Sequence, residues 1–88
     1  MIDYEFFIGK KATLVYVGVI IAKIVPEGKD FLIKARGKSI NKAVDVALIS
    51  SSKIKNIKIK NIEIGTQEIQ NIKKQMITLS TIEILLGE

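Results

Sequence analysis

Hydrophobic and polar residues alternate over the first eight positions of the chain. A period of two residues is typical of a β-strand with one buried face. The intervening positions, Asp3 and Glu5, are acidic and suit the exposed face. The pattern therefore predicts a strand over residues 2–8, with its apolar face formed by Ile2, Tyr4, Phe6 and Ile8.

Two further segments have the length or the spacing of helices. Residues 12–25 are apolar on nearly every side, and their length favours a helix, although their valine and isoleucine content would also suit a strand. A helix that is apolar all round must be covered all round, so we expect a subunit contact there. Residues 40–50 place apolar side chains at i, i+3, i+4, i+7 and i+8, which predicts a helix packed on a sheet, with Ser39 as its N-cap.

The remaining segments predict strands. Residues 31–35 form a second strand, and residues 57–66 and 75–86 form a terminal β-hairpin with a polar arm over residues 67–74. The apolar phase of the third strand shifts by one at Asn61, which predicts a bulge. The element order is β-α-β-α-β-β, which indicates one α/β domain over residues 1–88, an α+β sandwich whose first strands are parallel.

Composition restricts the chemistry that this domain can perform. The 88 residues contain no cysteine and no histidine, so the commonest metal ligands and the commonest general base are missing. The nine acidic residues are scattered and form no obvious catalytic pair. We therefore expect no enzymatic activity, no metal and no cofactor.

The charge of the chain is basic, with a formal net charge of +5. A basic balance favours polyanionic partners, and nucleic acid comes before an anionic membrane surface, but it also describes an ordinary lysine-rich solvated surface. The sequence begins without the pattern of a signal peptide, and its longest apolar run is too short to span a bilayer. We therefore expect a cytoplasmic protein.

Two strand-to-helix turns carry basic residues in a repeated arrangement. In each, a strand ends at a glycine beside basic residues, Gly9 in one and Gly37 in the other, and a helix follows. Since parallel strands end at one edge of a sheet, the two turns should form one patch that binds phosphate. The alternative is that both glycines are ordinary strand exits with solvated lysines. The candidate phosphate-binding residues are Lys10, Lys11, Arg36, Lys38, Asn41 and Lys42.

The hairpin and one aromatic residue offer further candidate contacts. Lys73 and Lys74 lie near the hairpin tip, and a two-stranded ribbon fits a groove of duplex DNA. A hairpin packed on a partner subunit explains its apolar residues equally well. Among the aromatic residues, only Phe7 lies on the polar face of its strand, where it could stack an unpaired base.

Five short motifs occur in order along the chain: Ile8–Lys11, Ile33–Lys38, Asn41–Asp45, Ile64–Thr66 and Ser80–Ile84. Together they resemble the Alba (Sac10b) family of archaeal DNA- and RNA-binding chromatin proteins. The resemblance implies a fold similar to the C-terminal domain of translation initiation factor three. It also implies a homodimer that coats DNA on the chromosome and binds RNA. The alternative within this resemblance is an RNA-binding subunit of an RNA-processing ribonucleoprotein, or an RNA chaperone.

The resemblance also implies roles for individual residues. It places Lys10 and Lys11 at the centre of the nucleic-acid surface, with Lys10 as the lysine that can be acetylated, which weakens binding. Arg36 and Lys38 match the basic turn that contacts backbone phosphate. The hairpin matches an arm that reaches toward the minor groove. The chain departs from the family in that Ala12 replaces the proline that usually follows the lysine pair.

Overall fold

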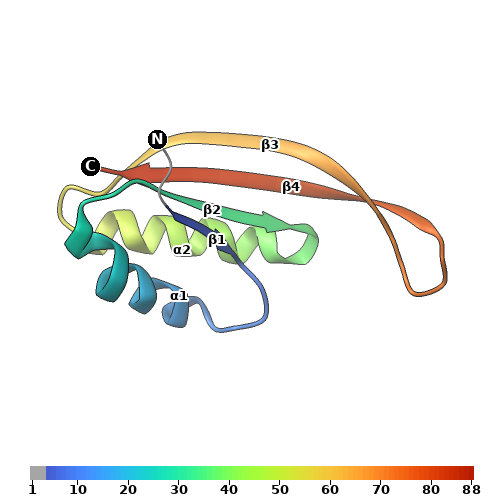
Figure 1. The fold of residues 1–88 in the computed structure, drawn as a ribbon, viewed down its shortest axis with the longest axis horizontal. Coiled ribbons are helices and arrows are strands. Elements are labelled where there is room, and N and C mark those ends of the chain that lie inside the picture. Colours follow the sequence, from blue (N-terminus) through green and yellow to red (C-terminus); the bar gives the residue numbers. More distant parts are fainter. Residues whose placement is uncertain (1–3) are drawn as a thin grey trace.

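The computed structural model describes residues 4–88, so the predicted strand positions Ile2 and Asp3 lie outside the described residues. Its helices and strands follow the predicted order β-α-β-α-β-β (Figure 1). Their bounds are β1 Tyr4–Phe7, α1 Thr13–Val19, β2 Phe31–Arg36, α2 Ile40–Lys53, β3 Lys58–Gln70 and β4 Met76–Gly87.

The four strands form one sheet in the order β1-β2-β4-β3. The β1 and β2 strands are parallel, and Tyr4 pairs with Phe31 and Phe7 with Lys34. This confirms the prediction that the first strands run in one direction. The β4 strand is antiparallel to both β2 and β3, so β3 points in the same direction as β2 without pairing with it.

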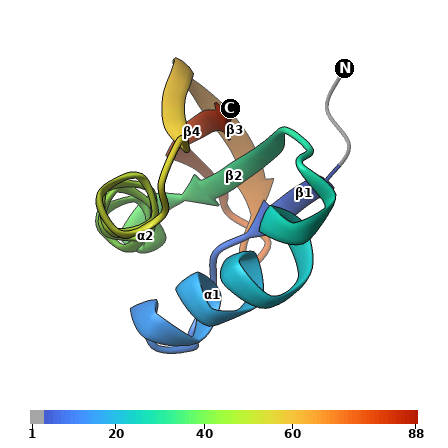
Figure 2. The same ribbon diagram turned by 90° about the vertical axis from the view of Figure 1, so that its left-hand side faces the viewer.

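Both helices pack on the same face of the sheet and leave the opposite face open (Figures 1 and 2). The core lies between these two layers. Phe31 is completely buried, and its ring meets the ring of Phe6 edge to face at a centroid distance of 6.5 Å. The core also includes completely buried aliphatic and small side chains from the helical layer and the central strands, among them Ile20, Ile33, Ala43, Val46 and Leu86.

The predicted helix over residues 12–25 continues beyond α1 through a π-helical turn, Ile20–Ile24, and a 3₁₀ turn, Val25–Glu27. Pro26 lies inside that last turn, so the helical path extends slightly past the predicted boundary, and Gly28 ends it with a left-handed φ of 63°. The outer side of this helical segment remains apolar and exposed. The exposed apolar residues on it include Leu14, Val15 and Ile21.

The predicted bulge is confirmed in β3. The register with β4 shifts between Ile59 and Asn61, which leaves Lys60 as the extra residue. Its ammonium lies 3.0 Å from Oδ2 of Asp30, which ties the bulge to the residue before β2. Ile59 and Ile62 are three residues apart, a spacing that would put them on opposite faces of a regular strand. Because of the bulge, both face the helix side of the sheet.

The hairpin is longer and more regular than the sequence predicts. Residues 67–70 belong to β3 instead of a separate arm, and the turn occupies residues 71–75. The hairpin projects past the ends of β2 and α2 and curves toward the helix side (Figure 1). The molecule is consequently elongated, with principal extents of 45 × 25 × 18 Å. Within residues 4–88, no helix is long and apolar enough to cross a membrane.

Candidate nucleic-acid interface

The turn between β1 and α1 presents two exposed lysines, Lys10 and Lys11. The backbone amide of Gly9 donates a hydrogen bond of 2.8 Å to the Tyr16 hydroxyl, which lies one turn into α1. The amide of Ile8 donates to the carbonyl of Lys34, so the strand pairing continues to the edge of this turn. The turn is therefore held at both ends, while its two ammonium groups point into solvent.

Lys42 on α2 holds the same turn from the other side. Its ammonium donates hydrogen bonds to the backbone carbonyls of Gly9, at 2.9 Å, and Lys11, at 2.7 Å. An ammonium has three N–H donors, so one remains for a ligand. The sequence predicts Lys42 as a phosphate contact, and the structure adds a second role in which it fixes the turn that carries Lys10 and Lys11.

The turn between β2 and α2 carries the other two cations. Arg36 ends β2, and Gly37 follows with a left-handed φ of 56°, which an L side chain would adopt only with strain. Gly37–Ser39 forms a 3₁₀ turn before α2. Ser39 is the N-cap residue of α2, as predicted, but its backbone is already helical and its side chain makes no capping hydrogen bond. Asn41 is exposed in the first turn of α2.

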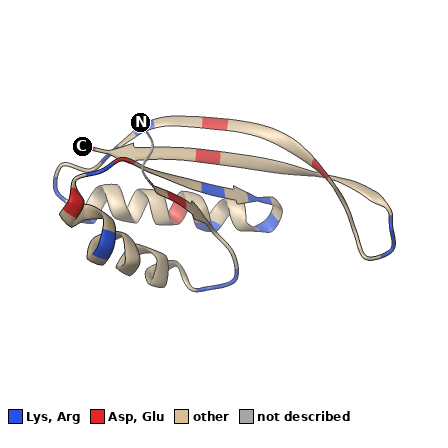
Figure 3. Ribbon diagram, in the orientation of Figure 1, with Lys and Arg blue, Asp and Glu red and all other residues tan. Residues whose placement is uncertain are grey.

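The structure places both turns at the same end of the molecular body, the end from which the hairpin projects (Figure 3). The parallel pairing of β1 with β2 brings them there, and the hydrogen bonds of Lys42 join them directly. We call Lys10, Lys11, Arg36 and Lys38 the twin-turn cluster. Four neighbouring cations on two rigidly joined turns can neutralise adjacent phosphates of one polynucleotide.

The hairpin lysines form a separate group. Lys73 and Lys74 lie at the hairpin tip, away from the twin-turn cluster (Figure 3). The tip is ordered by Asn71, whose Oδ1 accepts a hydrogen bond of 2.9 Å from the amide of Gln75. Lys74 adopts a left-handed φ of 63° in this turn. The tip thus carries a second group of positive charge, separate from the twin-turn cluster.

Two residues that sequence reasoning missed lie on the open face of the sheet. Lys34 pairs with Phe7 across β1 and β2, and its ammonium lies 5.2 Å from the centroid of the exposed Phe7 ring. Gln67 on β3 accepts a hydrogen bond of 3.3 Å from Nη1 of Arg36. The spacing of Lys34 and Arg36, two residues apart on one strand, signals that they share a face.

The described residues, 4–88, contain no group of three or more acidic side chains that could hold a metal ion. The ammonium and guanidinium groups of the twin-turn cluster can bind an anion electrostatically.

Comparison with known proteins gives a consistent set of relatives. A family model described as Alba matches residues 5–66. A protein named DNA/RNA-binding protein Alba from Methanococcus maripaludis is 37% identical over 86 residues, covering 96% of this chain and 97% of the relative. The solved structure of Alba from Thermoplasma volcanium has a TM-score of 0.87 and 36% identity, and covers 96% of this chain and 99% of that one. The fold is shared with ALBA1 from Trypanosoma brucei, with a TM-score of 0.75, 19% identity, and coverage of 96% of this chain and 68% of that one.

Proposed function

Because the chain belongs to the Alba family, we propose that it binds DNA and RNA through phosphate contacts and has no enzymatic activity. The relatives that carry the name DNA/RNA-binding protein Alba support this proposal. The observation that carries it for this chain is the joining of the two basic turns by Lys42. Lys10, Lys11, Arg36 and Lys38 make the primary phosphate contacts, with Asn41 and Lys42 beside them and the hairpin lysines extending the contact.

We further propose that the DNA-bound form is associated with the chromosome in the cytoplasm and that acetylation of Lys10 weakens binding. Acetylation removes the charge of the lysine and with it one phosphate contact. The exposure of Lys10 on a turn makes its ammonium accessible to a modifying enzyme. The alternative function, an RNA-binding subunit of a ribonucleoprotein or an RNA chaperone, uses the same cluster with structured RNA as the main partner.

Salt dependence and competition test the proposed function together. A dimer carries a formal charge of +10, twice the +5 of one chain. If four to six of the eight cations in its two twin-turn clusters contact phosphate at once, log K against log salt should have a slope of roughly −4 to −5. We expect duplex DNA and structured RNA to compete for one site at both low and high salt. A slope near zero would contradict phosphate binding. Tight binding to one RNA, with little affinity for random duplex DNA, would favour the ribonucleoprotein role.

The proposed homodimer has a candidate contact surface on the flank of α2 that faces away from α1. Ile62 and Ile64 pair with the buried Ile84 and Ile82, so they lie on the helix side of the sheet, but they are 52% and 82% exposed because α2 does not reach them. Leu48, 53% exposed, adds to this surface from α2. We call Leu48, Ile62 and Ile64 the α2–β3 apolar face. A second copy that covers it would remove this apolar area from water.

A pair of matched variants tests this contact. Ile64→Asp should weaken dimerisation by at least roughly 100-fold, since a two-fold axis buries two unpaired carboxylates at once. Leu14→Asp likewise replaces an exposed aliphatic side chain with a carboxylate, but on the exposed side of α1, and should leave the dimer intact. Sedimentation equilibrium of both variants measures the dissociation constants. If Leu14→Asp alone produces monomers, the dimer contact lies on the segment 12–25, as the sequence predicts.

A further inference from the structure

The open face of the sheet carries an aromatic ring that the core does not use. Phe6 and Phe7 are adjacent in β1, and the alternation of the strand sends them to opposite faces. Phe6 packs against Phe31 on the helix side, whereas Phe7 is 70% exposed on the open side. An exposed ring does not contribute buried apolar area to the stability of the fold. Core packing therefore does not explain why a large ring occurs on this flat surface.

Polar and charged groups surround this ring. The ammonium of Lys34 lies 5.2 Å from the ring centroid and 3.8 Å from Oε2 of Glu83. Since the ring is 70% exposed, this ammonium leaves most of the aromatic surface accessible. A ring with a cation beside it is suited to a flat, electron-rich ligand whose backbone carries negative charge.

A hollow of about 610 Å³ extends from Phe7 across the sheet. This volume lies within the range of roughly 300–1,000 Å³ that is typical of sites for small organic ligands. Amide, hydroxyl and carboxylate groups along its floor can both donate and accept hydrogen bonds, as the edge of a nucleobase requires. We call this site the sheet hollow, and its lining includes Phe7, Lys34, Arg36, Gln67, Thr81 and Glu83.

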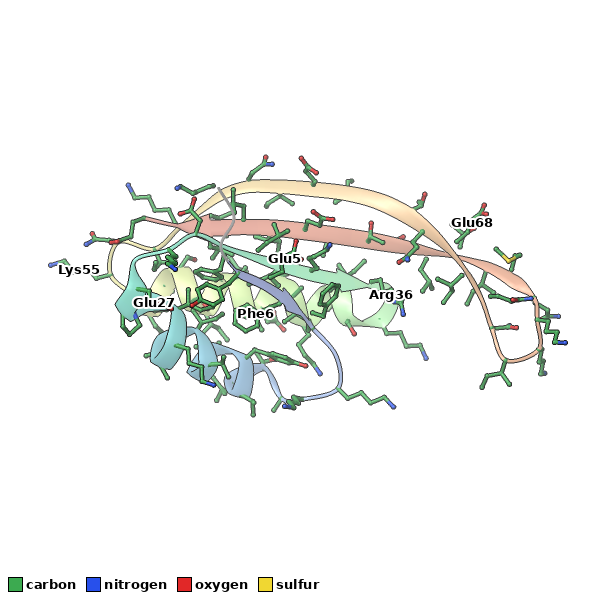
Figure 4. All side chains as sticks on the ribbon, viewed as in Figure 1. Glu5, Phe6, Glu27, Arg36, Lys55 and Glu68 are labelled. Atoms are coloured by element: carbon green, nitrogen blue, oxygen red, sulfur yellow. The ribbon has the colours of Figure 1, made fainter. Side chains whose placement is uncertain are left out.

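The sheet hollow is continuous with the twin-turn cluster. Arg36 belongs to both, and its hydrogen bond to Gln67 uses only Nη1, which leaves other guanidinium N–H groups for phosphate. Phe7 lies three residues before Lys10 on the same strand-to-turn segment. A polynucleotide whose phosphates contact the two turns therefore has its next base within reach of the Phe7 ring. Figure 4 shows Arg36 at this end of β2, on the side from which the hairpin projects.

We propose that the sheet hollow binds an unpaired nucleotide, with its base stacked on Phe7 and its phosphate held by Arg36 and the twin-turn cluster. Paired bases inside a duplex are covered on both faces by their neighbours, so they cannot stack on this ring. The ligand is accordingly a single-stranded segment of RNA or DNA, such as a loop or an end. This inference rests on the proposed function, because the twin-turn cluster supplies the phosphate contacts that deliver the base.

The Phe7→Ala variant tests the proposal with ligands that differ only in base accessibility. The probes are single-stranded oligothymidylate, oligouridylate, an abasic single strand and a blunt duplex, all of equal length. Loss of one stacked base should weaken binding to single strands with bases by about 5- to 150-fold. Binding to the duplex and the abasic strand should change by less than about twofold. Phe7→Tyr keeps the ring and should restore wild-type affinity, and the two base-bearing strands show whether DNA or RNA is preferred.

A second variant reports the contact directly. The chain contains no tryptophan, so Phe7→Trp introduces a single fluorophore at the proposed stacking position. Its fluorescence should be quenched by oligothymidylate or oligouridylate and remain unchanged with the abasic strand at saturation. The proposal is overturned if Phe7→Ala weakens the binding of all four ligands equally, or the binding of none of them. Those results leave phosphate binding by the turns intact, whereas failure of the wild-type protein to bind any probe would refute the proposed function itself.

Discussion

Replacing Lys10 and Lys11 together with alanine should weaken binding to every nucleic-acid sequence by about the same factor. Phosphate contacts do not distinguish one base from another, so the affinity for every sequence should fall. The proposed dimer loses four lysines, and if each contacts one phosphate, the slope of log K against log salt should fall in magnitude by about 3 to 4. At a fixed moderate salt concentration we expect at least a roughly 100-fold loss of affinity. Fluorescence anisotropy titrations at several salt concentrations measure both quantities.

The matched control is Lys53→Ala with Lys55→Ala. Both residues are exposed, and this variant also lowers the formal charge of the chain from +5 to +3 by removing two lysines. Lys55 lies at the opposite end of the body from Arg36 (Figure 4). The control should therefore lose only the small contribution of net charge. Equal losses for the two variants would mean that binding follows total charge and that the twin-turn cluster has no special role.

Phe31→Ala should remove a large part of the stability of the domain. Phe31 is completely buried at the start of β2 and holds β1 to the core through the Phe6 ring. Truncating a buried phenylalanine costs about 3–5 kcal/mol, whereas an 88-residue domain has a free energy of unfolding of about 4–13 kcal/mol. Thermal unfolding followed by circular dichroism should show a midpoint lowered by at least about 12 °C. Protein concentration must be held constant, because the proposed dimerisation would add to apparent stability.

Phe7→Ala is the control for this second experiment. It deletes the same side chain from an exposed position on the neighbouring strand, so its free energy of unfolding should change by no more than about 0.5 kcal/mol. The two variants should thus separate stability from binding, with Phe31→Ala impairing the fold and Phe7→Ala impairing the single-strand contact. A loss below about 1 kcal/mol for Phe31→Ala would be incompatible with the packing of β1 and β2 described above.

Periodicity along the chain was sufficient to predict most of the fold. The order of elements, the parallel pairing at the start of the sheet and the bulge predicted from the phase shift at Asn61 are all confirmed, because each depends on which face a side chain must occupy. The end of a helix or strand depends on local hydrogen bonds instead. Ser39 lies at the predicted N-cap position, but a 3₁₀ turn continues through it into α2 and its side chain makes no capping hydrogen bond.

Contacts between distant segments explain what the sequence could not reveal about the site. Lys42 is 31 residues from Lys11, and nothing in the spacing of either indicates that one ammonium would hold two carbonyls of the first turn. The Phe7–Lys34 pair likewise depends on the parallel register, which aligns these two residues only once the sheet has formed. The exposed cations themselves were predicted, because charge beside a glycine at a strand end is visible in the sequence.

The pairing of the hairpin has a consequence for how its reach can vary. The last β4 residue paired with β2 is Thr81, opposite Arg36, and from Ser80 to Met76 the strand pairs with β3 alone. Adding two residues to each strand beyond this point would lengthen the ribbon by about 7 Å and keep every existing side chain on its face. The core would be unaffected, since none of its buried residues lies between Gln67 and Leu79. If the hairpin contacts nucleic acid as proposed, its length sets how far that contact extends, so proteins with the same body would contact different lengths of polynucleotide.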